Sequence, residues 1–545
     1  MKKLSDDLKK SIARISCYRF SERVVTFFVL IALINCSGDV RDESASHKSS
    51  GRPNIIILYA DDLGYGDVGV YNPYSKIPTP NIDALAENGI RFTDAHSSSG
   101  ICSPSRYALL TGQYHWRKFH SIVSSFESSV FEPDEFTIAK MLQENGYKTA
   151  AIGKWHLGWD WEAIKVEGNN SSETTLPWGA PYTLYQPEAF DWSQSIPGGP
   201  VDQGFDYYFG DGTINFPPYT YIENDRVVEV PSTMMDETKF SERLEGDWYY
   251  RPGPMAESWN PNEVLPTITA KAEDWISQQD NKTPFFLYFA FPSPHAPIVP
   301  NQEFIGSSDA GPYGDFVFET DAMVGRLLDA LGAAGLAENT LIIFSSDNGA
   351  EKFAYERYRQ YSHWSSGDYR GLKRDLFEGG HRVPFIVRWP EVIKQATVSS
   401  QTINQVDIVS TIASIIGTRL TSSEAIDSHD YAQVLNQQQP LDRVVRQSSV
   451  HNTFEGAYAL RQGDWLYINT PDAAHTEVPQ WYSEDMQYEV DATEGLLYNL
   501  AEDPSQNNSL YLDYPEKVAQ MEALLSEYVS GKPSAPHSIS MEGAE

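Results

Sequence analysis

The chain has 545 residues, of which 75 are acidic and 41 are Lys or Arg, so its formal net charge at pH 7 is −34. This charge excludes the basic footprint of a nucleic-acid-binding protein, and a hydrophobic content of 41% with 13% aromatic residues excludes a disordered chain. The length predicts one large domain with a smaller one.

The first 36 residues are typical of an export signal. Basic residues precede an apolar run at 24–34, which is too short to span a bilayer. The run ends in LINC at 33–36, which resembles a bacterial lipobox with Cys36 as the lipidated residue, although Asn35 replaces the usual small residue. Simple signal-peptidase cleavage or an uncleaved anchor remain alternatives. We expect an exported protein, either periplasmic or a lipoprotein of the outer membrane or cell surface.

Residues 37–51 form a Ser-rich polar tether that links this signal to the folded chain. The chain has three cysteines, and two of them, Cys17 and Cys36, lie in the signal. An exported mature chain therefore has no internal disulfide to form with Cys102. A lone cysteine in an oxidising compartment requires a specific explanation.

Short apolar runs recur from residue 52 onward and predict strands buried on both faces, as in a parallel sheet. These runs lie at residues 54–59, 148–152, 284–289 and 341–344. Helical stretches between them lie at residues 80–88, 137–145 and 315–334. This alternation predicts an α/β fold with a large, mostly parallel sheet between helices.

Polar residues follow each predicted strand, where open α/β sheets bind their ligands. They are Asp61 and Asp62, Lys154 and His156, His295, and Asp347 and Asn348. Four such strand ends in one chain predict a single site at that edge of the sheet.

The remaining segments indicate the domain organisation. Residues 159–210 are rich in Trp, Tyr, Pro and Gly and predict a long loop. After an apolar helix at 405–417, short strands and a helix at 515–529 predict a small antiparallel subdomain. We therefore expect a catalytic domain at 52–435 and a C-terminal subdomain at 436–545.

The segment GICSPSR at 100–106, followed by LTG at 110–112, carries the most specific signal. Pro104 suits the first turn of a helix, which places Cys102 at a helix N-terminus, where anions are favoured. A buried structural cysteine is the alternative. The segment resembles the C-x-P-x-R signature of the type I sulfatases, members of the alkaline-phosphatase-like superfamily. The resemblance implies that a maturation enzyme oxidises Cys102 to formylglycine (3-oxoalanine), which would explain the lone thiol.

Further motifs extend the resemblance over residues 52–389 and, more loosely, into the C-terminal subdomain. They are GKWHLG at 153–158, PHAP around His295, GLK at 371–373 with EGGHRVP at 378–384, and LYNL at 497–500. The resemblance implies an alkaline-phosphatase-like fold and a site that includes Lys154, His156, His295 and Lys373. A surface lysine or a hydrogen-bonded histidine is the alternative for each residue taken alone.

Asp61, Asp62, Asp347 and Asn348 offer only oxygen ligands, which suit Ca²⁺ or Mg²⁺ and not zinc. A helix cap or a turn remains the alternative for each pair. The resemblance implies that these four residues ligate one Ca²⁺ together with an oxygen of the modified Cys102.

Catalytic roles are also implied by the resemblance. Ca²⁺, Lys154 and Lys373 would hold the sulfuryl oxygens while Arg106 orients the formylglycine hydrate. Asp347 would take a proton from the attacking hydroxyl and His295 would protonate the leaving oxygen. His156 would deprotonate the second hydroxyl, which expels sulfate.

We therefore expect a sulfuric ester hydrolase that acts on sulfated carbohydrate, as an exo-acting enzyme on oligosaccharides derived from polysaccharide. Aromatic residues beside cations would form sugar subsites or merely pack. They are Trp116, Arg117 and His120, and the 358–369 segment with Arg359, His363 and Trp364. A phosphodiesterase or phosphonate hydrolase of the same superfamily is one alternative function, and an inactive glycan-binding lipoprotein is another. Because the chain is acidic overall, an anionic substrate must meet a local cationic pocket.

Overall fold

The computed structural model describes residues 51–168, 170–240, 245–246, 250–436, 444–488 and 493–535, which all belong to one compact unit, Ser49–Glu545. The predicted export signal, Cys36 and most of the tether lie outside the described residues, so these remain predictions. Within the described ranges, none of the helices has the length and apolar character needed to cross a membrane.

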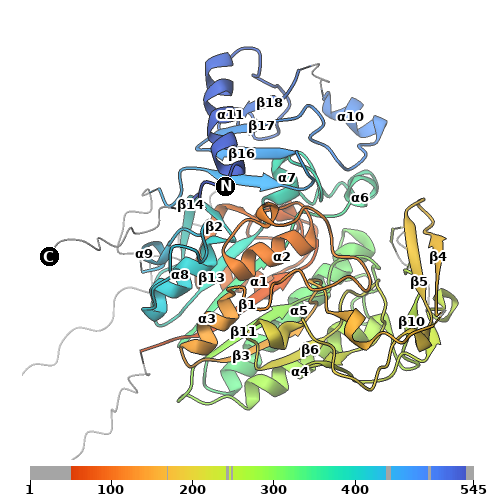
Figure 1. The fold of residues 1–545 in the computed structure, drawn as a ribbon. Helices are drawn as coiled ribbons and strands as arrows, with labels where there is room; N and C mark the ends of the chain where they lie inside the picture. Colours follow the sequence, from red (N-terminus) through yellow and green to blue (C-terminus); the bar gives the residue numbers. More distant parts are fainter. Residues whose placement is uncertain are drawn as a thin grey trace, which may run out of the picture. The chain divides into compact units, whose positions relative to one another are not determined.

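A large mixed sheet forms the centre of the fold (Figure 1). Its strands follow the order β14-β2-β13-β12-β1-β11-β3-β6-β7-β8. They are β1 Asn54–Ala60, β2 Ile90–His96, β3 Lys148–Gly153, β6 Tyr207–Gly210, β7 Ile222–Glu223, β8 Arg226–Val227, β11 Phe285–Ala290, β12 Thr340–Ser346, β13 Phe385–Arg388 and β14 Thr397–Asn404. The five strands from β12 to β6 run parallel to one another, while β13 is antiparallel to both of its neighbours. The predicted α/β class is confirmed.

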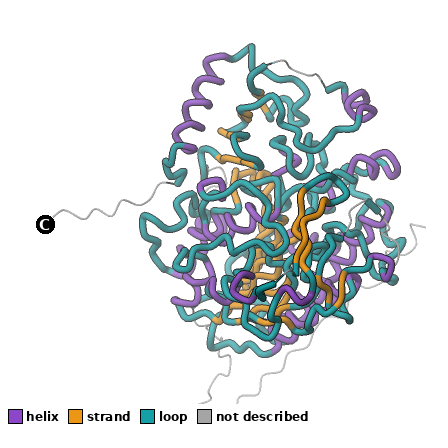
Figure 2. The backbone as a smooth tube through the Cα atoms, turned by 45° about the vertical axis from the view of Figure 1, so that its right-hand side comes forward, coloured by secondary structure: helices purple, strands orange, loops and turns teal. Residues whose placement is uncertain are grey.

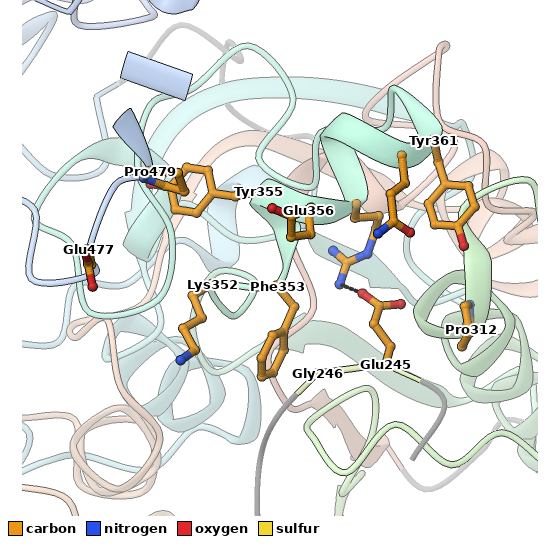
Figure 3. Close-up of a pocket in the computed structure, with 12 residues that line it drawn as sticks. Glu245, Gly246, Pro312, Lys352, Phe353, Tyr355, Glu356, Tyr361, Glu477 and Pro479 are labelled. Carbon is orange, nitrogen blue, oxygen red and sulfur yellow. Dashed lines mark hydrogen bonds and ion pairs between the residues drawn. The ribbon is translucent and has the colours of Figure 1, made fainter. Parts of the chain in front are cut away.

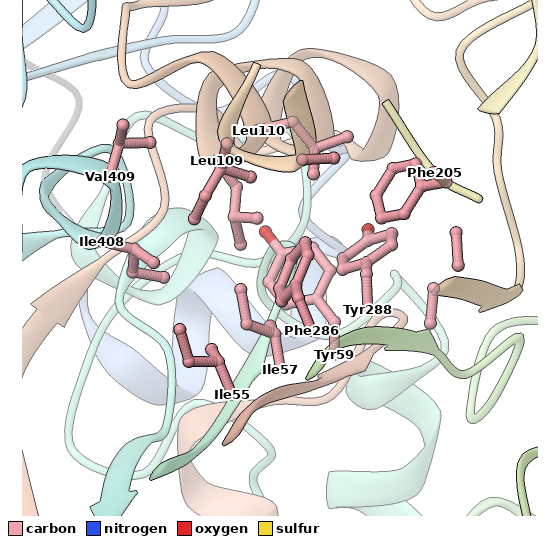
Figure 4. Packing of buried hydrophobic residues seen from close by; sticks show 14 of the residues in the cluster. Ile55, Ile57, Tyr59, Leu109, Leu110, Phe205, Phe286, Tyr288, Ile408 and Val409 are labelled. Atoms are coloured by element: carbon pink, nitrogen blue, oxygen red, sulfur yellow. The ribbon is translucent and has the colours of Figure 1, made fainter. Parts of the chain in front are cut away.

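Helices cover both faces of this sheet, and the alternation of side chains along β1 shows which helices face which side. Ile55, Ile57 and Tyr59 pack in one core with residues of α2 Cys102–Thr111, α3 Ile138–Glu144, α8 Asp407–Ile416 and α9 Ala432–Leu435 (Figure 4). Ile56 and Leu58 pack in a second core with residues of α1 Pro80–Glu87, α4 Pro261–Ser277 and α5 Gly311–Ala333. Figure 2 shows the strands inside and the helices around them. Every residue of β1 is buried, which explains its unbroken apolar run.

A smaller antiparallel sheet follows near the C-terminus, as predicted. Its strands are β15 Ser449–Asn452, β16 Tyr458–Gln462, β17 Trp465–Ile468 and β18 Leu496–Asn499, paired in that order. Helix α11 Pro515–Val529 packs one face through Val518, Met521 and Leu525. The other face packs against Leu376 and Phe377, so this sheet supports the segment that carries Lys373.

The prediction of a long loop at 159–210 missed a hairpin and a strand of the large sheet. Strand β4 Ser171–Thr175 pairs with β5 Pro181–Tyr185 in a hairpin, and the segment ends in β6 of the large sheet. The sequence of β4, SSETT, is exposed throughout and therefore lacks the apolar alternation that marks a half-buried strand. Strand β6 has only four residues, which is too short for a clear pattern.

Short elements complete the described fold. They are α6 Ala354–Tyr361, α7 Glu378–His381, α10 Gln480–Met486, β9 Thr233–Met234 and β10 Pro254–Met255, with 3-10 turns at Tyr65–Asp67, His115–Arg117, Trp161–Ile164, Pro187–Ala189, Pro200–Gln203 and Glu237–Lys239.

Candidate active site

Four neighbouring parallel strands, β12, β1, β11 and β3, end at one edge of the large sheet. The predicted strand-end residues follow these four strands, and α2 adds Cys102 and Arg106. Together with Lys373 they form what we call the catalytic cluster: Asp61, Asp62, Cys102, Arg106, Lys154, His156, His295, Asp347, Asn348 and Lys373. Its most exposed member, His295, is only 7% exposed, so the cluster lies beneath the surface.

Cys102 is the first residue of α2, as predicted from Pro104. The N-cap residue Ile101 makes no side-chain cap, so the first N–H groups of the helix are free to donate to an anionic group. The Cys102 Sγ donates to Asp61 Oδ1 at 3.5 Å. Burial and the nearby Asp347 carboxylate raise the pKa of the Cys102 thiol, so an unmodified Cys102 stays protonated near neutral pH.

Three carboxylates meet at the centre of the cluster. Asp347 Oδ1 accepts the backbone N–H of Asp62 at 3.1 Å, and Asp347 Oδ2 accepts from Arg106 Nη2 at 2.7 Å and from Nε at 3.1 Å. Burial opposes ionisation of Asp61, but the nearby Lys154 ammonium, His295 imidazole and Arg106 guanidinium outweigh it and lower the Asp61 pKa to about 2. For Asp347, burial and the charge of Asp61 prevail and raise the pKa.

Two buried lysines neutralise this charge. Lys154 Nζ donates to Asp61 Oδ2 at 2.6 Å, and Lys373 Nζ lies 2.7 and 2.8 Å from the two carboxylate oxygens of Asp62. Burial would lower the pKa of Lys373, but Asp62 raises it well above the usual value. With Arg106, the lysines supply three positive charges against the three aspartates, so the cluster without an ion is close to neutral.

The two catalytic candidates among the histidines are held by single carbonyl contacts. His295 Nδ1 lies 2.5 Å from Ala296 O, and His295 Nε2 lies 3.7 Å from Asp62 Oδ2. His156 Nε2 lies 3.0 Å from Val123 O, and its buried Nδ1 has no hydrogen-bond partner in the described structure. Burial lowers the pKa of both imidazoles. A left-handed backbone at His156 (φ +54°) and at Asp62 (φ +63°) is strained for a non-glycine residue.

The carboxylate and amide oxygens of the cluster suit a hard cation. One potential ligand atom from each of Asp61, Asp62, Cys102 and His295 lies within 4.8 Å of the others. Asn348 Nδ2 donates to Asp62 Oδ1 at 2.7 Å and to Gly349 O at 2.9 Å, which leaves the buried Asn348 Oδ1 without a partner among the described residues. A buried amide oxygen without a donor is costly, and a bound Ca²⁺ would satisfy it.

Sequence reasoning missed two acidic residues that belong to the surroundings of the cluster. Glu351 lies 3.8 Å from Lys373 Nζ and forms a bidentate pair with Arg374 at 2.7 and 2.8 Å. Asp211 follows β6, the neighbour of β3, and both of its buried carboxylate oxygens lack a partner in the described structure. Burial raises the Asp211 pKa to about 7 against the opposing charge of Lys154. Had β6 been predicted as a strand, Asp211 would have been identified as a polar residue that follows a strand end.

The aromatic and cationic residues considered as sugar subsites have internal partners. Arg117 pairs with Asp427 at 2.7 Å, and Trp116 packs edge-on against Tyr458 of the C-terminal sheet at 5.7 Å. His363 is buried and bonds Asp67 at 2.8 Å, while Trp364 stacks on Tyr482 at 4.9 Å. These contacts favour packing over substrate binding for these four residues.

A separate pocket of about 610 Å³ lies beside α6 (Figure 3). Its lining includes the acids Glu245, Glu356 and Glu477, with Lys352 and Arg357 as the cations. Because Arg357 already pairs with Glu245 at 3.0 Å, this pocket has no cationic excess for a sulfate group. The pocket is therefore a poorer anion site than the catalytic cluster.

A second buried group, the histidine cluster of His96, His381 and His451, also brings three ring nitrogens within 4.8 Å of one another. Each imidazole has one nitrogen beside an acceptor: Asp94 Oδ1 at 2.9 Å, Leu376 O at 3.2 Å and Ser97 O at 3.0 Å, respectively. The rings of His381 and His451 stack 3.8 Å apart at an interplanar angle of 5°. Lone pairs in parallel ring planes do not converge on one ion, so this cluster is not arranged to bind a metal.

Comparisons with known proteins show which family the chain belongs to. A model of the sulfatase family matches residues 53–418. The chain belongs to the sulfatase family and is therefore a sulfuric ester hydrolase.

Several relatives match over most of their length. The chain is 31% identical to an N-acetylgalactosamine-6-O-sulfatase of Bacteroides thetaiotaomicron, which covers 90% of this chain and 96% of the relative. It is 31% identical to human arylsulfatase A over 84% of this chain and 83% of that protein. A solved structure from work on the metabolism of multiple glycosaminoglycans by B. thetaiotaomicron aligns with a TM-score of 0.72 at 30% identity, covering 88% of this chain and 100% of the other.

Proposed function

We propose that this sulfatase removes sulfate from sulfated carbohydrate, with residue 102 converted to formylglycine and one Ca²⁺ bound beside it. The observation that carries the proposal is the position of Cys102. It lies at an uncapped helix N-terminus, its Sγ is 3.5 Å from Asp61, and three carboxylates and three cations surround it. When formed, the formylglycine supplies an oxygen nucleophile through its hydrated aldehyde, and a maturation enzyme must form it.

The donor set supports Ca²⁺ as the metal. Asp61, Asp62, Asp347 and Asn348 would hold the ion through carboxylate and amide oxygens, and the unpartnered Asn348 Oδ1 fits this role. When bound, Ca²⁺ supplies Lewis-acid stabilisation of negative charge on oxygen. Because the cluster is close to neutral without the ion, a divalent cation leaves an excess of positive charge that suits a sulfate ester.

The side chains of the cluster divide the remaining work. Lys154 and Lys373 bind sulfuryl oxygens with their ammonium groups, since both Nζ atoms already face the carboxylates at the centre. Arg106 holds Asp347 through two N–H groups and thereby orients the carboxylate that accepts the proton of the nucleophile.

The two histidines handle protons at different groups, one on the substrate and one on the modified residue 102. His295 is the most exposed member of the cluster and supplies a proton to the leaving oxygen. His156 has a buried Nδ1 without a partner among the described residues, and it accepts the proton of the second hydroxyl of the modified residue 102, so that the C–O bond to sulfate breaks and the aldehyde forms again.

Carbohydrate is the proposed substrate class because the similar B. thetaiotaomicron protein is named an N-acetylgalactosamine-6-O-sulfatase. The buried position of the cluster favours a terminal sugar over the interior of a long chain, which supports exo-action on oligosaccharides. We further propose export to the periplasm or the cell surface, with a lipid on Cys36, on the basis of the N-terminal sequence.

The test is sulfate release from a panel of defined sulfated oligosaccharides by protein co-produced with a formylglycine-generating enzyme. Phosphate esters of the same alcohols serve as controls for phosphohydrolase activity. We expect sulfate release from sugars sulfated at the non-reducing end. Faster cleavage of the phosphate esters, or no sulfate release from any sugar, would refute the proposal.

A further inference from the structure

A half-buried arginine near His156 lacks a carboxylate partner among the described residues. Arg251 Nη1 donates to Ser124 Oγ at 2.6 Å, and its guanidinium carbon lies 3.5 Å from the centre of the Phe216 ring. The buried Arg251 Nε has no hydrogen-bond partner in the described structure. By contrast, every buried arginine among the described residues forms an ion pair. These arginines are Arg106, Arg357, Arg382, Arg446 and Arg461.

This arrangement costs folding free energy. Burial lowers the pKa of Arg251, which shows that its charge is partly removed from water. An unpaired, partly buried charge destabilises the folded protein unless a partner arrives. The cation–π contact with the Phe216 ring offsets part of this cost. Because no carboxylate among the described residues pairs with Arg251, its guanidinium can accept an oxyanion of a ligand as its partner.

Arg251 is separated from the catalytic cluster by one aromatic ring. Phe216 meets the His156 ring edge-to-face with ring centres 5.4 Å apart. Ser124, which holds Arg251, follows Val123, whose carbonyl holds His156. Ser124, Phe216 and His156 line one small pocket. Glu127 also lines this pocket, but its Oε2 accepts the backbone N–H of Ser124 at 2.6 Å.

We propose that Arg251 binds a second anionic group of the carbohydrate, a sulfate or a carboxylate, while the sulfate ester to be cleaved lies at Lys154 and Lys373. The planar guanidinium suits both oxyanions, because each can accept two parallel N–H groups. The inference rests on the proposed function and narrows its substrate class to sugars that carry at least two negative charges.

The test compares three oligosaccharides with the same scissile sulfate: one without another charge, one with a second sulfate, and one with a uronic carboxylate. Variants are Arg251→Met and Arg251→Lys, with Arg419→Met at an exposed position as the control for loss of one positive charge. We expect Arg251→Met to lower kcat/KM about 10–100-fold on a doubly charged substrate if Arg251 binds its second sulfate or its carboxylate. The loss should come mainly from a higher KM. On the singly charged substrate we expect a change of less than about 3-fold, and Arg251→Lys should retain part of the activity. The carboxylate and sulfate substrates show which oxyanion is preferred.

Two outcomes separate this inference from the proposed function. If the wild-type protein releases sulfate but Arg251→Met loses the same factor on all three substrates, or loses nothing, the role of Arg251 is refuted and the sulfatase activity stands. If the wild-type protein cleaves none of them, the proposed function itself fails. Should Arg251→Met not fold, the proposal is tested on the wild type by measuring its preference for doubly charged substrates as the salt concentration rises. A preference for doubly charged substrates that does not weaken as salt rises would overturn the proposal.

Discussion

The catalytic cluster and the histidine cluster are both buried, and both bring potential metal ligands within 4.8 Å of one another. They differ in charge and in the direction of their lone pairs. In the catalytic cluster, charged groups crowd together and Asn348 Oδ1 lacks a partner. In the histidine cluster, each imidazole is anchored by an acceptor and two rings stack face to face.

The difference shows that proximity of ligand atoms does not by itself define a metal site. Oxygens around one point, with their charge balanced by lysine ammonium groups, can exchange those partners for an ion and a substrate. Neutral imidazoles anchored in place contribute to packing instead. The histidine cluster joins the large sheet, through His96 at the end of β2, to the C-terminal sheet, through His451 in β15.

The largest contrast is expected from removing the nucleophile. Cys102→Ala should lower kcat/KM on an aryl sulfate by at least about 10³-fold, because alanine lacks the side chain that would be oxidised to the aldehyde. His451→Phe, the matched change in the histidine cluster, should stay within about 3-fold of wild type. Mass spectrometry of the wild type should show the aldehyde at residue 102. Full activity of Cys102→Ala would end the formylglycine proposal.

The second largest difference between the two clusters is expected when the metal is removed. Chelation should lower activity and the melting temperature, and Ca²⁺ should restore both better than Zn²⁺, since the donors are oxygens. Asp61→Asn should lower activity about 10²-fold or more and weaken the Ca²⁺-dependent rise in melting temperature. His451→Phe should keep that rise. Wild-type protein that contains no metal by elemental analysis, yet is fully active, would contradict this prediction.

A smaller effect should distinguish the two catalytic histidines. His295→Ala should lose about 10–100-fold more rate on a sugar sulfate than on an aryl sulfate, because a phenolate leaves without protonation. His156→Ala should slow both substrates alike, because it acts after the leaving group has departed. Steady-state rates on the two substrates check this, with the melting temperature as the control for folding. Equal losses for His295→Ala would assign that residue to sulfate binding instead.

The smallest expected effect concerns the stability of the histidine cluster. Burial lowers the pKa of all three imidazoles, that of His381 to about 3. Because the unfolded chain binds protons at histidine near pH 6.5 and the folded cluster does not, stability is present above pH 6.5 and is lost as the pH falls toward 3.

Each histidine should contribute up to about 1.4 kcal/mol of this loss per pH unit below 6.5. Urea unfolding at pH 7 and pH 5 measures it, and His451→Phe should show a shallower decline than wild type. An identical decline in both proteins would mean that these imidazoles do not dominate the acid sensitivity.

The large sheet was predictable because its central strands are buried on both faces. Residues 55–60 form an unbroken apolar run whose length is typical of a strand buried on both faces. The hairpin β4–β5 and the four-residue β6 were not predictable, because exposed or very short strands carry no hydrophobic period. Missing β6 also concealed Asp211, the polar residue at its end.

The sequence by itself determined the residue types of the site and their order on the strands, because strand ends in an α/β sheet converge by topology. It also determined the family, through the motifs around Cys102 and Lys154. Only the tertiary structure decided which charges neutralise one another and which atoms remain without partners. Asp62 and Lys373 lie 311 residues apart in sequence, and in the fold Lys373 Nζ lies 2.8 Å from Asp62 Oδ2. The strength of such an ion pair depends on the distance between the charges and on their burial, and the local sequence determines neither.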